Sequence, residues 1–525
     1  MGPTRPHPAG SDWTPSRSCD RLTAFPMQAP EAAQTASTTD GDRRLVLRNT
    51  MYLGIAEVLS MPLSIALNAM IGRYLGPVDV GHIYLATTIA GLAFLVVGWG
   101  HNGSLPAAVV LDKPSSGRLL GSSIAWRAAA SIVVYAIVAL GCFALGFTGL
   151  QQWAIGLVFL QQTFATFNSA CQDVIRGFER TDIAAFARVG VQFVSMALVI
   201  PVLVLGGKLR LTLLAQALSV LIVLYPVIRT LGPVGVGRMT WDWERVKSLT
   251  VSGTPFALFA LALVLQPNID AFYLAKLSPP EVLGWYAVSR RLLGVLLVPA
   301  TALIGALYPT LCRLYATDLE GFRLTTRDSL STVCLLVVPM ALGCALYPDV
   351  GVAIFGRDAF GPAEDILLYS SPYLFLVYFS MPIGCALVAS GRQRGWTVIQ
   401  LLCVANSALL DPFLIEYFQD AVGNGGLGLG VAAGISELFM VVAGMIIMPR
   451  GVFGRAFAKT FALAVLSGGA MAGAAWSLRV LPSLAAAPIA VVVYGVALYG
   501  SGAISREQLS GLWKLVRRKL SRSKG

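Results

Sequence analysis

Residues 68–84 read NAMIGRYLGPVDVGHIY, and residues 268–286 read NIDAFYLAKLSPPEVLGWY. Each stretch closes one apolar segment, passes through a short acidic turn that contains proline, and opens the next apolar segment with glycine and tyrosine. A second match, at an offset of 211 residues, pairs Pro201 with Pro412. Weak internal symmetry of this kind is typical of membrane proteins built from structural repeats. The pattern therefore predicts two related halves that run in the same direction through a membrane.

The composition supports a membrane protein. Hydrophobic residues make up 56% of the 525 residues and charged residues 13%, with a mean hydropathy of +0.71. A soluble domain has roughly 45–50% apolar and about 25% charged residues, so a large soluble catalytic domain is excluded. Apolar runs long enough to span a bilayer of ~30 Å predict an all-α protein with about fourteen transmembrane helices. We expect these spans at about 50–72, 80–100, 119–146, 152–175, 183–206, 210–230, 250–275, 282–308, 330–355, 365–390, 395–418, 427–449, 457–478 and 485–504.

The charges predict the orientation of the spans. If both termini are cytoplasmic, 26 Lys and Arg residues flank the spans on the inner side and six on the outer side. Such an excess is the positive-inside pattern of membrane proteins. It explains the net charge of +12 without a nucleic-acid partner. The six outer cations are Arg73, Lys208, Arg210, Lys276, Arg357 and Arg479.

These patterns predict a domain organisation of two six-helix lobes and one additional helix pair. The basic C-terminal segment is expected to lie on anionic phospholipids. The expected parts are a disordered tail (1–45), an N-lobe (46–230), a cytoplasmic amphipathic linker (231–249), a C-lobe (250–449), two further helices (450–505) and a basic cytoplasmic tail (506–525).

Several classes of enzyme are disfavoured by missing motifs. The sequence has no GxxxxGK[ST] loop, which excludes an ATP-driven pump in this chain. A membrane glycosyltransferase usually needs a sizeable outer loop for its chemistry, and all expected outer loops are short. The three histidines are scattered, so no metal site is expected. We therefore expect a protein that is not an enzyme.

Three stretches carry a resemblance to a known superfamily: YLGPVDVGHIY at 74–84, ASGRQR at 389–394 followed by Asn406, and GGLGLGVAAGISE at 425–437. With the predicted topology, they resemble the multidrug, oligosaccharidyl-lipid and polysaccharide exporter superfamily. Within it, the chain looks most like the Wzx-type oligosaccharide flippases. The resemblance implies a two-lobed bundle that works by alternating access, with a central cavity lined mainly by helices 1, 2, 7 and 8.

Charged residues within the spans are costly to insert and are candidates for function. Arg290 and Arg291 fall about 14 Å into the eighth span by helix rise. A guanidinium there could bind a diphosphate bidentately. Two adjacent positions are ~100° apart on a helix, so we expect at least one of the two arginines to face the cavity. The alternative for these arginines is a structural ion pair with a carboxylate such as Glu57. Glu57 itself, two turns into the first span, is the third candidate for substrate binding and could pair with a cavity cation.

A second set of residues is a candidate for energy coupling. Asp270 and Asp411 fall at a similar depth of the predicted C-lobe. With Asn406 they could form an oxygen cage for Na⁺ or share a proton. The resemblance adds that members of the superfamily can bind a cation there with helices 7, 11 and 12. Asn406 and Asp411 are ~140° apart on a regular helix, so only a bend at Pro412 would bring them together. The alternative is that each aspartate hydrogen-bonds a backbone group freed by a proline.

The functional expectation is a flippase in the bacterial inner membrane. It would move a polyprenyl-diphosphate-linked oligosaccharide to the outer leaflet for cell-surface polysaccharide synthesis, and would act as a monomer. No cofactor is expected beyond Na⁺ or a proton as coupling ion. The alternatives within the superfamily are a cation-coupled multidrug antiporter and a lipid II flippase. The two arginines favour an anionic substrate over an organic cation.

Overall fold

A computed structural model describes residues 40–449 and 451–502, and these residues form helices and turns without a strand. The expected basic tail at 506–525 and most of the expected N-terminal tail at 1–45 lie outside the described residues. The helices are α1 (Asp40–Gly98), α2 (His101–Leu111), η2 (Lys113–Ser115), α3 (Ser116–Ala144), α4 (Gly149–Gly177), α5 (Thr181–Val204), α6 (Leu209–Val234), α7 (Trp243–Leu277), α8 (Pro280–Leu296), α9 (Val298–Thr317), α10 (Leu319–Leu346), α11 (Pro348–Val352), α12 (Arg357–Phe360), α13 (Pro362–Ala389), α14 (Gln393–Val422), α15 (Gly426–Ile447), α16 (Arg455–Ser477) and α17 (Ser483–Gly500).

The first quoted stretch forms the break inside α1. The first two expected spans meet at Gly76, whose φ of 77° and ψ of 179° are not helical. A side chain is strained at such a positive φ, whereas glycine tolerates it. Pro77 then restarts the helix, because a first-turn proline loses no hydrogen bond there. The expected turn between these spans is therefore this single kink.

The eighth expected span, 282–308, differs from the structure. It consists of two helices, α8 and α9, that meet at an angle of 43°. Pro299 lies in the first turn of α9, where it lacks the N–H that a continuous helix would need. The expected span is therefore bent at this position, and α8 and α9 meet the criteria for a membrane span only together.

Ten helices of the described chain are long and apolar enough to cross a membrane, or eleven if α8 and α9 form one bent span. The first of these ten runs over Gly54–Leu111 and contains two expected spans. α4 and α7 coincide with expected spans but are not among them. The exact count of fourteen therefore stays a prediction.

Packing divides the helices into two groups. One group consists of α2, α3, α4, α5 and α6, which contact one another. The second consists of α8, α9, α10, α13, α14, α15, α16 and α17, which are linked through shared contacts. α7 contacts α2 and α3 of the first group and α8 and α14 of the second. α7 thus touches both groups, and α16 and α17 pack on the second group through α10. The predicted division into two six-helix lobes and one additional helix pair stays a prediction.

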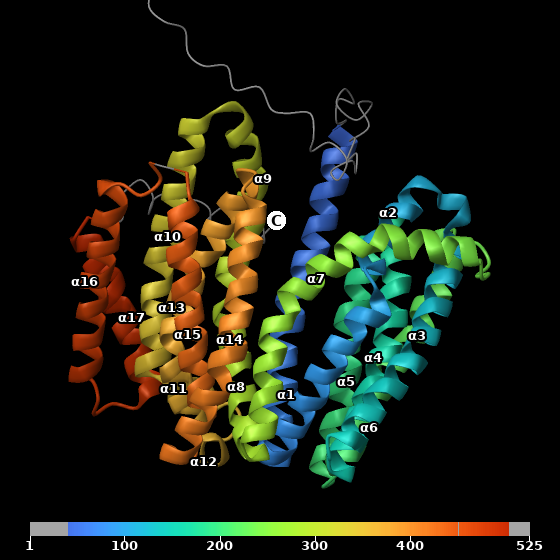
Figure 1. Ribbon diagram of the computed structural model, residues 1–525, viewed down its shortest axis with the longest axis horizontal. Coiled ribbons are helices and arrows are strands. Elements are labelled where there is room, and N and C mark those ends of the chain that lie inside the picture. Colours follow the sequence, from blue (N-terminus) through green and yellow to red (C-terminus); the bar gives the residue numbers. More distant parts are fainter. Residues whose placement is uncertain (1–39, 450, 503–525) are drawn as a thin grey trace, which may run out of the picture. The chain divides into compact units, whose positions relative to one another are not determined.

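The expected outer loops lie at one end of the helices and the expected inner loops at the other (Figure 1). At the outer end, the Lys276 ammonium donates to the Leu145 carbonyl at 2.7 Å. At the inner end, Arg245 pairs with Asp112 at 3.2 Å. The pKa of Asp112 is lowered mainly by a hydrogen bond from Ser115 and to a smaller extent by the positive charge of the nearby Arg245.

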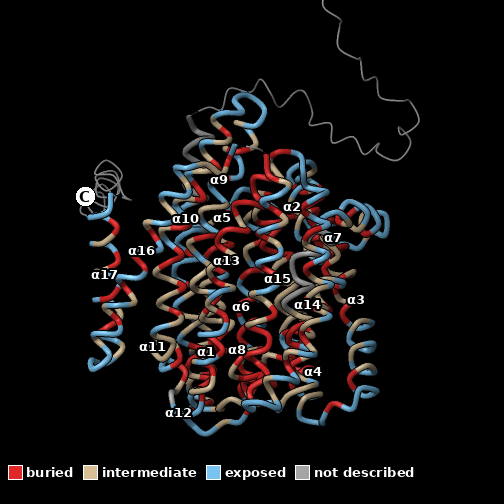
Figure 2. Tube along the Cα trace, turned by 60° about the vertical axis from the view of Figure 1, so that its left-hand side comes forward, coloured by how far each residue is buried: buried red, intermediate tan, exposed pale blue. Residues whose placement is uncertain are grey.

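Apolar side chains are exposed along the outer helices. Figure 2 shows buried residues concentrated where helices pack and exposed ones along helices such as α3 and α17. Ile132 and Phe143 of α3 are 73% and 74% exposed, and Val496 of α17 is 66% exposed. Such apolar faces suit the hydrocarbon of a bilayer. Helices can lie there because their backbone groups are hydrogen-bonded within each helix.

Candidate functional site: a cavity between the helix groups

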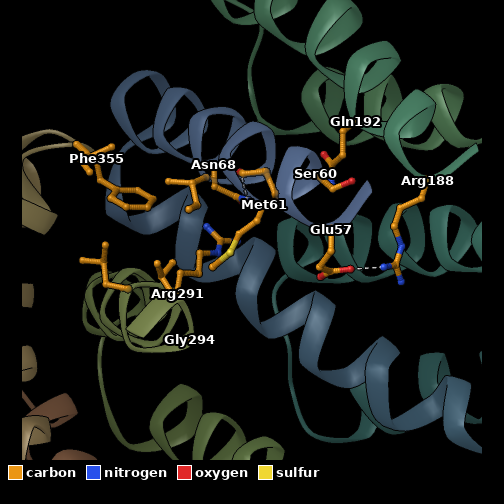
Figure 3. Close-up of a pocket in the computed structure, with 14 residues that line it drawn as sticks. Glu57, Ser60, Met61, Asn68, Arg188, Gln192, Arg291, Gly294 and Phe355 are labelled. Carbon is orange, nitrogen blue, oxygen red and sulfur yellow. Dashed lines mark hydrogen bonds and ion pairs between the residues drawn. The ribbon is translucent and has the colours of Figure 1, made fainter. Parts of the chain in front are cut away.

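A cavity of about 520 Å³ lies between α1, α5 and α8. Figure 3 shows its residues, which come from the first half of α1, from α5, from α8 and from the segment after α11. The cavity is thus lined by both helix groups. Its polar or charged lining residues are Glu57, Ser60, Ser64, Asn68, Arg188, Gln192 and Arg291.

Arg291 brings a positive charge into this cavity. It extends from α8 toward Asn68 and Met61 of α1 (Figure 3). Its Nη1 atom is buried and has no hydrogen-bond partner among the described residues. An unsatisfied guanidinium donor is costly away from water, so a ligand with acceptor oxygens would be favoured at this position.

Glu57, the other predicted residue in the cavity, pairs with Arg188 of α5 rather than with Arg291 (Figure 3). Both side chains remain substantially exposed, at 67% for Glu57 and 49% for Arg188. An exposed ion pair of this kind contributes only about 0–1 kcal/mol to stability. The pair also affects the electrostatics of the cavity. Because Glu57 is paired with Arg188, it does not compensate the positive charge of Arg291.

Arg290 faces a different environment from its neighbour. Its guanidinium lies within hydrogen-bonding reach of the hydroxyls of Tyr84 and Tyr373, and 5.9 Å from the ring centre of Tyr373. It also interacts electrostatically with Asp270. The helical offset of ~100° explains why two adjacent arginines point to two different sites.

Asp270 of α7 and Asp411 of α14 face each other. The two carboxyl groups interact electrostatically, and both residues are buried, at 6% and 0% exposure. The Ser407 hydroxyl lies 3.4 Å from Asp411 Oδ1, while Asp411 Oδ2 and Asp270 Oδ1 have no partner among the described residues. Two buried carboxylates repel unless a proton or a cation lies between them.

Asn406 does not turn toward this aspartate pair. Its Nδ2 donates to Ser436 Oγ of α15 at 3.0 Å. α14 continues as a helix through Pro412, so the ~140° offset between Asn406 and Asp411 is retained. The Asn406 side chain is therefore directed to α15 and not to the aspartates.

The end of the cavity near Phe355, which is the expected outer end, is covered by contacts between α1 and the segment after α11. Arg73 of α1 donates from Nε to the Ile354 carbonyl at 2.8 Å and from Nη2 to the Ala353 carbonyl at 3.3 Å. A Cβ atom on Gly72 would lie 3.3 Å from the Phe355 ring, so this ring packs closely on α1. Access to Arg291 from the outer side requires these contacts to separate.

The two quoted sequence stretches meet near this covered end. A Cβ atom on Gly81 would lie 2.3 Å from the Pro280 carbonyl oxygen, and one on Gly284 would lie 2.0 Å from the Pro77 carbonyl oxygen. At the other end of the helices, a Cβ on Gly100 would lie 1.9 Å from the Gly253 carbonyl oxygen. Only glycine permits such close backbone approaches.

Sequence reasoning did not select Arg188, Asn68, Gln192 or Phe355 for the site. Arg188 lies close enough to the inner helix end to be interpreted as a cation that reaches water. Asn68 was visible as part of the quoted stretch. Gln192 and Phe355 carry no signal in one sequence, because their place in the cavity depends on how α5 and α11 pack.

Comparison with solved structures identifies the fold. The structure of the lipid II flippase MurJ in an inward closed conformation matches with a TM-score of 0.66 at 12% identity, over 85% of this chain and 98% of that chain. An inward-facing multidrug resistance MATE family transporter of the MOP superfamily matches with a TM-score of 0.59 at 14% identity, over 74% of this chain and 94% of that chain. A third match is a MOP superfamily transporter from Pyrococcus furiosus, which is described as having a binding pocket of reverse polarity. Its TM-score is 0.51 at 15% identity, over 76% of this chain and 95% of that chain.

At these identities the likeness establishes the fold, which is that of the MOP superfamily transporters. No curated protein matches the sequence. The model of one family, polysaccharide biosynthesis protein, matches residues 46–315, which is more than half of the chain. These residues include both quoted stretches and the arginines of α8. The chain therefore belongs to the polysaccharide biosynthesis protein family.

Proposed function

We propose that this protein is a flippase that moves a polyprenyl-diphosphate-linked oligosaccharide across the bacterial inner membrane, from the cytoplasmic to the outer leaflet. The observation that carries the proposal is Arg291, which lines a cavity between the two helix groups and whose buried Nη1 has no hydrogen-bond partner among the described residues. A diphosphate would supply acceptor oxygens to this guanidinium. The family of the chain supports a role in polysaccharide synthesis.

The size of the cavity limits which part of the substrate it holds. A volume of about 520 Å³ lies within the usual range of ~300–1,000 Å³ for small-molecule sites. It would accommodate the diphosphate and the nearest sugar. Asn68 and Gln192 offer amide groups for sugar hydroxyls. The polyprenyl chain would remain in the bilayer, since burial of its methylene groups in hydrocarbon is favourable.

Alternating access would depend on the contacts at the two helix ends. The Arg73 hydrogen bonds and the Gly81–Gly284 approach hold the outer ends together in this structure. Opening to the outer side would separate them. The close approach of Gly100 to Gly253 at the opposite end is also present in this structure, so opening to the cytoplasmic side would have to separate that contact instead. Both termini would be cytoplasmic, as the charge distribution indicates.

Energy coupling is assigned to the aspartate pair. Asp270 and Asp411 would hold a proton or Na⁺ between their facing carboxyl groups, with the Ser407 hydroxyl beside Asp411. Arg290 interacts with Asp270 and is the residue next to Arg291. Occupation of the pair would change the charge that Arg290 faces, which links the coupling ion to the helix that carries the substrate arginine.

The aspartate pair is also the observation that favours the second candidate, a cation-coupled multidrug antiporter. An organic cation would need carboxylates in the cavity. Glu57 is the cavity's carboxylate among the described lining residues, and Arg188 already neutralises it. The flippase is therefore the better fit to the charges.

The test is a deletion strain whose polyprenyl-linked glycans are analysed by mass spectrometry. Accumulation of one glycan lipid on the inner leaflet, reversed by the wild-type gene but not by Arg291→Ala, supports the proposal and identifies the substrate. Unchanged glycan lipids together with altered sensitivity to cationic drugs would favour the antiporter instead.

A further inference from the structure

A second hollow lies between α3 and α4, away from the residues of the proposed transport cavity. This α3–α4 groove has a volume of about 700 Å³ and is lined mainly by apolar and aromatic side chains. Its lining includes Ile132, Tyr135, Trp153, Leu160, Thr163 and Phe167. α3 and α4 contact each other along the groove.

The groove runs along most of the depth of the membrane. It begins at Gly149, the first residue of α4 at the expected outer end, and reaches Phe167. Eighteen residues of helix rise correspond to ~27 Å, close to the ~30 Å of bilayer hydrocarbon. Ile132 and Trp153 are 73% and 57% exposed, so the groove is open at its side. Hydrocarbon chains are the molecules that surround such a surface in a bilayer.

A positive charge lies at the outer end of the groove. The guanidinium of Arg210, in the first turn of α6, stacks over the Trp153 ring at 5.3 Å from its centre. Trp153 is itself a lining residue of the groove. Lys208, the residue before α6, adds a second cation nearby in sequence. Two of the six cations expected on the outer side thus fall at the N-terminal end of α6, against the general bias toward the inner side.

We infer that the α3–α4 groove binds one anionic phospholipid of the outer leaflet, with an acyl chain along the groove and its phosphate at Arg210. Tryptophan is favoured at the membrane interface, where its ring lies at headgroup level. Stacking on Trp153 holds the guanidinium beside the point where a chain enters the groove. Charge selects the headgroup, since a basic residue attracts an anionic lipid more than a zwitterionic one. The inference uses none of the residues assigned to transport.

The test is native mass spectrometry of the full-length protein in neutral detergent, with phosphatidylglycerol or phosphatidylcholine added at equal concentrations. We expect one molecule of phosphatidylglycerol to bind more tightly than phosphatidylcholine. Arg210→Gln should weaken phosphatidylglycerol binding about fivefold, the change expected for one basic residue at an anionic lipid. Arg210→Lys should retain most of the preference, because it keeps the charge.

The matched control is Arg479→Gln. Arg479 also stacks on a tryptophan at the expected outer side, Trp476, at 4.8 Å from the ring centre, but this pair is not part of the groove. Thr163→Phe fills the groove and should lower the binding of both lipids while leaving the headgroup preference unchanged. Equal binding of the two lipids to the wild type, or equal losses for Arg210→Gln and Arg479→Gln, would overturn the inference. Binding of polyprenyl phosphate in preference to phosphatidylglycerol would overturn it as well.

Discussion

Gly81 and Gly284 occupy equivalent positions in the two sequence repeats, and each one packs against the backbone of the other's repeat. A Cβ atom on Gly81 would lie 2.3 Å from the Pro280 carbonyl oxygen, and one on Gly284 would lie 2.0 Å from the Pro77 carbonyl oxygen. The contact is reciprocal, as expected where two equivalent segments meet near the axis of a repeat. It explains why the same turn occurs twice in the sequence.

Gly81→Ala and Gly284→Ala should each prevent full closure of the outer helix ends. A Cβ at under 3 Å from backbone oxygen forces α1 and α8 apart. We expect glycan export to fall at least tenfold, and a cysteine at Met61 to react faster with an impermeant thiol reagent from outside. Gly54→Ala and Gly305→Ala are the controls, since a Cβ there meets nothing within 4 Å. If the controls lose as much export as the pair, the contact has no special role.

Arg291→Ala should abolish export, because it removes the cavity cation that has an unpartnered donor. A hydrogen bond to a charged group is worth roughly 1.5–3 kcal/mol, so substrate affinity should fall by about one to two orders of magnitude. Arg291→Lys should recover part of it, since lysine keeps the charge but loses the bidentate geometry. Export is measured as surface glycan by mass spectrometry. Wild-type export in Arg291→Ala would remove this residue from the substrate site.

Loss of the Glu57–Arg188 ion pair should reduce substrate export more than it reduces the stability of the fold. Arg188→Gln leaves the Glu57 carboxylate uncompensated in the cavity, which should reduce export of a diphosphate. The double variant Glu57→Gln/Arg188→Gln should recover it. Melting temperatures should change little in all three variants, because an exposed pair contributes about 0–1 kcal/mol. No recovery in the double variant would show that the effect of Arg188 is not electrostatic.

Asp270→Asn and Asp411→Asn should each alter the dependence of transport on an ion gradient. Replacing either carboxylate leaves one negative charge, so the pair no longer needs a proton or cation between its groups. Transport by the full-length protein in vesicles is measured with and without a Na⁺ or proton gradient. Glu437→Gln is the control, because Glu437 is a buried carboxylate that pairs with the Ser380 hydroxyl instead. Unchanged gradient dependence in both aspartate variants would remove the pair from coupling.

Much of the fold is visible in the sequence because hydrophobic length and charge bias depend on local composition. The spans of α3, α5, α6 and α14 agree with the expected ranges to within a few residues at most ends. The bend between α8 and α9 was missed, although Pro299 is present in the sequence. A proline in a membrane helix is compatible with a straight or a bent span, and neighbouring helices decide between them.

The site was only partly visible. Helix rise and the angular offset of adjacent residues are sufficient to place Arg291 about 14 Å into the eighth span and to direct it away from Arg290. The partner of Glu57 could not be predicted, because Arg188 lies on α5 and meets α1 only through packing. Helix rise placed Asp270 and Asp411 at a similar depth of the membrane, which led us to expect that they lie close together. The contact of Asn406 with Ser436 could not be predicted, because it depends on the rotation of α14 about its own axis.

The most direct test of flipping uses the purified full-length protein in liposomes that contain a fluorescent polyprenyl-diphosphate-linked oligosaccharide. A membrane-impermeant reagent that destroys the fluorophore reports which leaflet the substrate occupies. We predict that the wild-type protein makes nearly all substrate accessible to the reagent, whereas Arg291→Ala leaves about half protected, as in protein-free liposomes. Equal protection with the wild-type protein and without protein would contradict the proposal that this protein flips lipid-linked glycans.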